Sequence, residues 1–416
     1  MSLERARRVA DAVLYEGYVL YPYRASARKN RYRWTFGVVM PRGWSGGEPS
    51  SMTLECLVET DAAAPPAIEG LLRFLQIERR QVQAAGIDAF EDADSITIAG
   101  EEHVTWDEGL ERELAFTVGA PAAVAPGTAR RVLDARLDGG VRETPLAERG
   151  VVLGRVTRTR CPLAATVTAA LTPLSPTLTK LTLTVDNASA LADVAAPRHE
   201  AVQAALVGAH LLLSVRGGAF VSLLDPPAHA RAHAGSCASV GLFPVLAGEP
   251  GSRAHLFASP IALYDHPAIA AESPGHTFDG AEIDELLALS TRALGDDEKR
   301  QARATDPRAA EVIDRADRLS DDALLALHGK SRTAAFAPGS RVRVRLQAPS
   351  GPRRTDAQDM FLDGRVGVVE ELREDFDGQT HVAIILEDDP AAELHRWYGR
   401  HLHFRPDELE LVEAAP

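Results

Sequence analysis

The segment from Ser259 to Glu285 constrains the architecture most, because the sequence pattern differs on its two sides. It carries six acidic residues and two histidines, and a Tyr-Asp-His-Pro turn and a Ser-Pro-Gly turn shape it. Strand-like runs dominate before it, whereas a helical pattern and then short alternating strands follow it. The chain has 416 residues, more than the roughly 250–300 at which a single hydrophobic core stops growing. We therefore predict an α+β fold with a β-rich region at 1–260 (one or two subdomains), a mostly helical connector at 261–332, and a small five-stranded β-barrel at 338–413.

The clearest strand pattern lies at 178–187, where Leu181, Leu183 and Val185 alternate with threonines. Such alternation indicates a strand with one buried face, although Leu178 is out of phase. Aromatic and β-branched residues predict two further strands, at 15–24 and 33–40. The apolar run at 68–82 is compatible with either a helix or a strand.

Helices are predicted at three places. Residues 200–213 form a pattern of about three helical turns. Asp225, followed by two prolines, predicts the start of another helix. Residues 296–327 also have a helical pattern. After residue 338, four short alternating runs separated by Asp-Gly turns predict the C-terminal barrel.

The charge and cysteine content limit the possible partners. The chain carries 59 acidic and 45 basic residues, a formal net charge of -14. A protein that binds nucleic acid needs a basic face to neutralise phosphates, so we expect no nucleic-acid partner. Three widely separated cysteines form no CxxC pair, which fits a reducing compartment. We find neither a signal-peptide pattern nor a membrane-spanning window, and we expect a cytoplasmic protein without a membrane span.

The first candidate site is the aromatic and basic segment from Tyr15 to Trp34. Arginine side chains beside aromatic rings can bind anions or peptides, and the same mixture can hold single-stranded nucleic acid. The alternative, which we favour, is a buried sheet core with a solvated basic turn. The residues expected to contact a ligand or partner are Tyr21, Tyr23, Arg24, Lys29, Asn30, Arg33 and Trp34.

The acidic segment is the second candidate site. Negative side chains such as Asp279 suit the first turn of a helix, and an aspartate can cap it. Paired carboxylates can also bind a hard cation or perform acid–base chemistry, but the ligand spacing of a calcium loop is absent. We weigh helix capping first, partner docking second and catalysis third. The residues concerned are Asp265, His266, Glu272, Asp279 and Glu282.

Two sets of histidines have spacings that could hold a metal. His229, His233 and Cys237 stand at i, i+4 and i+8, which is one stripe if they lie on a helix. A glycine within the run weakens that helix, and no HExxH signature is present. The second set lies in 393–404, where three histidines and two arginines beside aromatic residues could form a ligand surface, and His401 and His403 would share one face of a strand. For the first set we favour exposed histidines, and for 393–404 we favour solvent-facing residues of an edge strand. The sequence leaves any metal or cofactor unknown.

Two parts of the chain resemble known families. The stretches LYEGYVLYPYRASARKNRYRWTFGVV (14–39) and SPIALYDHPAIAAESPGHTFDGAEIDELLALSTRALGDDEKRQ (259–301) resemble a bacterial protein family associated with gene neighbourhoods of NiFe uptake hydrogenases. This resemblance implies a role in assembly, maturation or holding of a partner. The stretch GSRVRVRLQAPSGPRRTDAQDMFLDGRVGVVEEL (339–372) resembles the small Src-homology-like barrel of nitrile hydratase β-subunits. The clustered cysteines of the nitrile hydratase α-subunit are absent, so that activity does not follow.

These observations lead to three functional expectations. The leading one is a non-catalytic accessory protein of a NiFe hydrogenase system, which contacts a hydrogenase subunit or a maturation factor. The sequence contains no Walker loop, GxGxxG, GxSxG or HExxH motif, which agrees with a non-catalytic role. The second is a metal-dependent or acid–base enzyme with its site around Asp265–Glu285. The third is a small-molecule binding module in the β-rich region, which requires a pocket.

Overall fold

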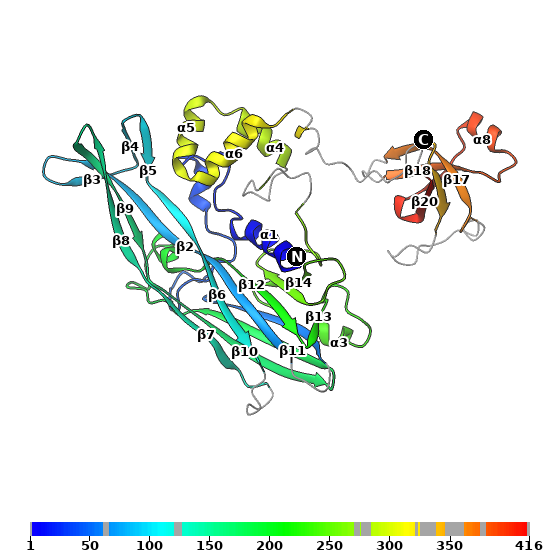
Figure 1. The fold of residues 1–416 in the computed structure, drawn as a ribbon, viewed down its shortest axis with the longest axis horizontal. Helices are drawn as coiled ribbons and strands as arrows, with labels where there is room; N and C mark the ends of the chain where they lie inside the picture. Colours follow the sequence, from blue (N-terminus) through cyan, green and yellow to red (C-terminus); the bar gives the residue numbers. More distant parts are fainter. Residues whose placement is uncertain are drawn as a thin grey trace. The chain divides into compact units, whose positions relative to one another are not determined.

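The computed structural model describes residues 2–60, 66–119, 127–269, 275, 284–320, 323–324, 338–345, 362–374 and 380–413. The chain divides into two compact units, Met1–Leu324 (unit 1) and Leu325–Pro416 (unit 2). Strands predominate in both units, with few helices (Figure 1), so the predicted β-rich character is confirmed. The helices of the predicted connector belong to unit 1. Among the described residues, no helix is both long and apolar enough to cross a membrane.

Two antiparallel sheets form most of unit 1 (Figure 1). The first has the order β13 (Gly218–Val221), β1 (Ser51–Thr60), β11 (Leu178–Asn187), β10 (Leu163–Ser175) and β7 (Arg130–Leu137). The second has the order β14 (Phe243–Ala247), β15 (His255–Ser259), β12 (Val207–Arg216), β2 (Ala67–Ala85), β9 (Val151–Arg160) and β8 (Gly140–Glu148). Strands β3 (Phe90–Ala93) and β6 (Trp106–Val118) also pair with β2, and β4 (Ser95–Ile98) pairs with β5 (Glu101–Val104).

The main hydrophobic core combines buried residues of both sheets. Strand β11 contributes Leu181, Leu183 and Val185, while its intervening threonines are half-buried, which confirms the predicted alternation. The out-of-phase Leu178 is buried in a separate cluster with Leu57. A side chain of odd phase on a strand points to the opposite face, so Leu178 serves a second, smaller core. The ambiguous run at 68–82 is part of the long strand β2, which pairs with neighbours on both sides.

The helices of unit 1 whose full bounds lie in the described residues are short. They are α1 (Ser2–Leu14), α2 (Arg198–Ala201), α3 (Arg231–Ala234), α4 (Asp284–Arg292), α5 (Asp296–Thr305) and α6 (Pro307–Arg318), with 3₁₀ turns η1 (Arg28–Tyr32) and η2 (Val202–Ala204). Helix α1 contacts β12, β14 and β15 of the second sheet. The helical pattern predicted from residue 296 is broken at Asp306, whose side chain accepts from the backbone N–H of Arg308 at 2.8 Å and so caps α6.

Four predictions of local structure are wrong. The helix predicted at 200–213 is a short helical turn followed by strand β12, because β12 is buried on both faces and a fully buried strand lacks the alternation that reveals strands. The helix predicted after Asp225 is only the four-residue α3. The strands predicted at 15–24 and 33–40 are turns and bends with a single bridge from Val39 to Leu206, because their aromatic side chains pack in a cluster instead of along a sheet.

Unit 2 contains an antiparallel five-stranded sheet. Its order is β19 (Leu402–Phe404), β18 (Thr380–Leu386), β17 (Val366–Glu374), β16 (Arg341–Val344) and β20 (Leu409–Glu413). Helix α8 (Ala392–Tyr398) precedes β19, and the 3₁₀ turn η4 (Pro406–Glu408) precedes β20. The four predicted strands are present. Among the described strands no pairing joins β19 to β20, so the structure shows the five strands as one sheet and does not show its closure into the predicted small barrel.

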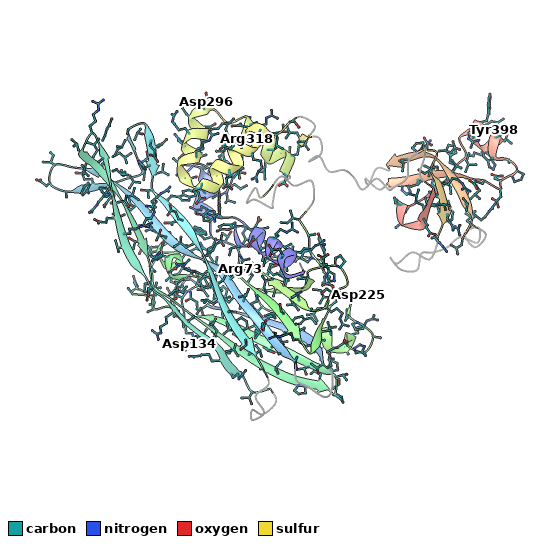
Figure 2. The ribbon with its side chains drawn as sticks, in the orientation of Figure 1. Arg73, Asp134, Asp225, Asp296, Arg318 and Tyr398 are labelled. Carbon is teal, nitrogen blue, oxygen red and sulfur yellow. The ribbon has the colours of Figure 1, made fainter. Side chains whose placement is uncertain are left out.

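A buried polar network lies beneath α1. Arg73 of β2 is almost fully buried (Figure 2) and pairs with Asp11 of α1 at 2.6 Å and Glu113 of β6 at 2.8 Å. His210 lies opposite Arg73 on β12 and is fully buried. Its Nδ1 is 2.8 Å from the carbonyl oxygen of Gly208. Burial, reinforced by the nearby Arg73 charge, lowers the pKa of His210 to about 3, so the imidazole is neutral in the folded protein.

Because the buried His210 is neutral, we predict that the free energy of unfolding falls in mild acid. The unfolded chain binds a proton below about pH 6.5, whereas the folded chain resists protonation down to about pH 3. The contribution of His210 to the free energy of unfolding is therefore complete above pH 6.5. It declines as the pH falls and is about 2 kcal/mol smaller at pH 5. Urea unfolding at pH 7 and pH 5 measures it. We expect His210→Gln to remove this part of the pH dependence and the exposed His199→Gln to keep it; equal slopes for all three proteins would contradict the assignment.

Candidate functional site

The Tyr15–Trp34 segment forms an aromatic cluster inside unit 1. The ring centroids of Tyr15 and Tyr18 are 5.4 Å apart, and those of Tyr18 and Trp34 are 5.2 Å apart. Tyr18 is fully buried; its hydroxyl donates to Asp306 at 2.7 Å and accepts from the N–H of Gly109 at 3.0 Å. The interpretation of this segment as buried core is therefore correct for the tyrosines at its centre, although the surrounding backbone is not a sheet.

One side of this segment holds the helices α4–α6. The Tyr21 hydroxyl donates to the carbonyl of Ser290 in α4 at 3.4 Å, and Arg24 pairs with Glu298 in α5. The hydroxyl of Thr305 donates to the carbonyl oxygen of the buried Tyr23 at 3.1 Å. Three of the predicted contact residues thus have structural partners within unit 1. A fourth, Lys29, is exposed.

The other side of the segment lines a pocket of about 690 Å³. Asn30, Arg33 and Trp34 of the predicted set contribute to it. The remaining lining residues come from distant parts of the chain and are Thr35, Glu48, Asp107, Arg198, His199 and Val202. Sequence reasoning missed Glu48, Asp107, Arg198 and His199, because only the packing of β6 and α2 against the segment brings them together.

Arg33 is the central charged residue of this pocket. It is 6% exposed, and its guanidinium lies 3.7 Å from the ring centroid of Trp106 and 4.4 Å from that of Trp34. Its Nε donates to the carbonyl of Tyr18 and its Nη2 to the carbonyl of Asp107, each at 2.6 Å. Burial lowers the pKa of Arg33 to about 10, so the side chain still carries its positive charge at neutral pH.

Trp34 has an unusual backbone conformation at this pocket. Its φ of 62° lies in the left-handed region, which costs a bulky residue roughly 1–3 kcal/mol. Its carbonyl oxygen accepts from Nη2 of Arg198 at 2.8 Å. Arg198 also donates to both carboxylate oxygens of Glu48, at 2.6 and 2.9 Å. Four other described non-glycine residues also have a positive φ, but Trp34 is the one of these five that lines this pocket. Strained residues held by such surrounding contacts concentrate at functional sites.

The two described members of the acidic candidate site have structural roles. Asp265 accepts from the hydroxyl of Ser222 and from the N–H of Leu246. The N–H of His266 donates to the carbonyl of Leu246 at 2.7 Å, and its Nε2 accepts from Gly251 at 3.3 Å. Both residues therefore attach this loop to the end of β14. The other three, Glu272, Asp279 and Glu282, lie outside the described residues.

The predicted histidine sets form no metal site in the described part of the chain, where no group of three His, Cys, Asp or Glu residues could hold a metal. His229 precedes α3 and Cys237 follows it, so the predicted stripe does not exist. His229 instead lies 2.7 Å from Glu59, and His401 lies 3.3 Å from Glu371.

A second surface, on α8 of unit 2, was missed. Leu394, Trp397 and Tyr398 are all exposed, Trp397 by 84% of its surface; Tyr398 is labelled in Figure 2. Their i, i+3, i+4 spacing is visible in the sequence, but interpreting this stretch as an edge strand concealed it. We refer to these three residues as the α8 face.

No protein-family model matches the chain, and no curated protein sequence matches it.

Proposed function

We propose that this chain is a non-catalytic, cytoplasmic accessory protein of a NiFe hydrogenase system. In this proposal unit 2 is the small barrel suggested by its resemblance to nitrile hydratase β-subunits, and it contacts a hydrogenase subunit or a maturation factor. The resemblance of 14–39 and 259–301 to the hydrogenase-associated family supports the identity of the system. The orientation of α8 supports the mode of action.

The α8 face points away from the sheet that carries it. On the polar side of the helix, Nδ1 of His395 is 2.7 Å from the carboxylate of Asp389, and Arg396 donates to Glu370 of β17 at 2.6 Å. No residue of α8 is buried. An ordinary surface helix buries its apolar stripe and exposes its charges, whereas α8 exposes its apolar stripe as well.

An exposed apolar stripe of this kind is typical of a protein contact. Tryptophan and tyrosine supply much of the binding energy where proteins meet. The ion pairs behind α8 fix the helix before binding, so the partner does not have to order it. We therefore place the partner contact on the α8 face, and expect the partner to offer an apolar groove.

Affinity capture tests this proposal. The tagged full chain is mixed with an extract of cells that produce the hydrogenase subunits and maturation factors, and the bound proteins are identified by mass spectrometry. We expect a hydrogenase subunit or maturation factor with wild-type protein and its loss with Trp397→Ala/Tyr398→Ala. The matched control is Tyr264→Ala, which removes an exposed aromatic ring from unit 1. Capture of neither kind of protein would overturn the proposal.

The pocket at Arg33 favours a second function, the binding of a small molecule by unit 1. Its volume of about 690 Å³ lies within the range of about 300–1,000 Å³ that is usual for ligand sites. The two functions are compatible, because they use different units of the chain.

A further inference from the structure

The ion pairs around the Arg33 pocket leave Arg33 without a carboxylate partner in the described chain. Glu48 is paired with Arg198 at 2.6 Å, and Asp107 is paired with Arg79 at 3.2 Å. Arg33 has no carboxylate within 4.0 Å among the residues that the structure describes. Each acid of the pocket is thus paired with another arginine, Glu48 with Arg198 and Asp107 with Arg79 from outside the lining, and Arg33 has no ion pair in the part of the chain that is described. A buried charge normally has a partner, because desolvation without one is costly.

The guanidinium of Arg33 also has unused donors. A guanidinium carries five N–H groups, and two of those of Arg33 donate to backbone carbonyls, one from Nε and one from Nη2. Within the described chain, Nη1 has no acceptor in hydrogen-bonding distance. The edge formed by Nη1 and the second Nη2 proton is therefore free, and it has the geometry that binds both oxygens of a carboxylate.

We propose that this pocket binds a small organic monocarboxylate. Its carboxylate accepts two hydrogen bonds from the free edge of Arg33, and its apolar body packs against Trp34 and Val202, which line the same pocket. A single negative charge gives Arg33 the ion-pair partner that it lacks. A dianion such as phosphate would add a second charge close to Glu48 and Asp107, which disfavours it.

Titration calorimetry with three probes tests this proposal on the full chain. We use sodium benzoate, sodium acetate and inorganic phosphate at constant ionic strength. Benzoate is expected to bind most tightly, because its ring also removes apolar surface from water. Acetate should bind more weakly, and phosphate most weakly of the three.

Two variants locate the site. Arg33→Lys keeps the charge but loses the planar fork, and should weaken benzoate binding by roughly 10- to 100-fold. Because a change at a buried residue can disturb folding, His199→Glu is the second variant. His199 lines the pocket with a side chain that is 71% exposed, and an acid there should weaken benzoate binding by repulsion. Leu224→Glu introduces the same charge change at an exposed position outside the pocket lining and should leave binding unchanged.

Each result has a definite meaning. Tighter binding of benzoate than of phosphate, weakened by His199→Glu and not by Leu224→Glu, supports the monocarboxylate site. Absence of benzoate binding, or equal binding by His199→Glu and Leu224→Glu, overturns it. Tighter binding of phosphate overturns the ligand class. None of these outcomes depends on the hydrogenase partner. The proposed ligand site in the Arg33 pocket and the proposed partner contact on the α8 face are therefore tested independently.

Discussion

Replacing Trp397 with alanine is expected to weaken the affinity for the hydrogenase partner by roughly 30- to 1,000-fold, the range of an aromatic hot spot. Trp397 has the most exposed side chain of the α8 face, and a partner groove that covers it would remove its indole ring from water. Biolayer interferometry with the partner identified by capture measures the change in Kd.

The same substitution should leave the free energy of unfolding almost unchanged, because an 84% exposed side chain contributes little packing. Tyr264→Ala serves as the control for loss of an exposed ring elsewhere. An unchanged Kd for Trp397→Ala would show that the partner does not use the α8 face. A large loss of stability would show that the ring packs within the chain.

Replacing Asp306 with alanine is expected to lower the free energy of unfolding of unit 1 by roughly 2–4 kcal/mol. Asp306 is 4% exposed and has two tasks. One oxygen accepts from the N–H of Arg308 and caps α6, and the other accepts from the buried hydroxyl of Tyr18. Alanine removes the cap and leaves the tyrosine donor without an acceptor. Urea unfolding, followed by circular dichroism, measures the loss.

Asp306→Asn is the matched control for this prediction. Its amide oxygen can still cap α6, so we expect a smaller loss than for alanine, but its amide nitrogen cannot accept from Tyr18. Tyr18→Phe should reproduce the Tyr18 part of the effect. If alanine and asparagine destabilised unit 1 equally, the cap would contribute nothing, and α6 would be held by its apolar face alone.

The sequence predicted the fold best where one face of a strand is buried. In β11, threonines alternate with Leu181, Leu183 and Val185, and this pattern alone identified the strand. In β12 every residue from Val207 to Leu213 is buried, so there was no alternation to detect and the segment resembled a helix. Whether a strand shows alternation depends on whether one or both of its faces are covered by other elements. The sequence of the strand alone does not tell which of the two applies.

The candidate site was predicted only in part, for a similar reason. The mixture of aromatic and basic residues pointed to Arg33 and Trp34, and both line the pocket. The sequence could not show that Tyr23 and Arg24 face the helices instead. Nor could it show that Arg198 joins Arg33 across more than 160 positions of the chain. Local composition can suggest a site, but long-range packing determines which residues complete it.

The α8 face was missed because assigning its residues to a strand destroyed the relevant spacing. On a strand, Leu394 and Trp397 would point to opposite sides. On α8, with Tyr398, they form one stripe. The left-handed Gly399 that ends the helix, with a φ of 63°, was the available signal, because glycine commonly follows the last turn of a helix.

Hydrogen–deuterium exchange of the full chain, with and without the captured partner, tests the central claim most directly. It reports which backbone amides a partner protects, without any substitution. We predict that the partner slows exchange in α8, at 392–398, and leaves exchange in the core strands of unit 1 unchanged. Protection confined to unit 1, with α8 exchanging at its free rate, would contradict the claim that the α8 face carries the partner contact.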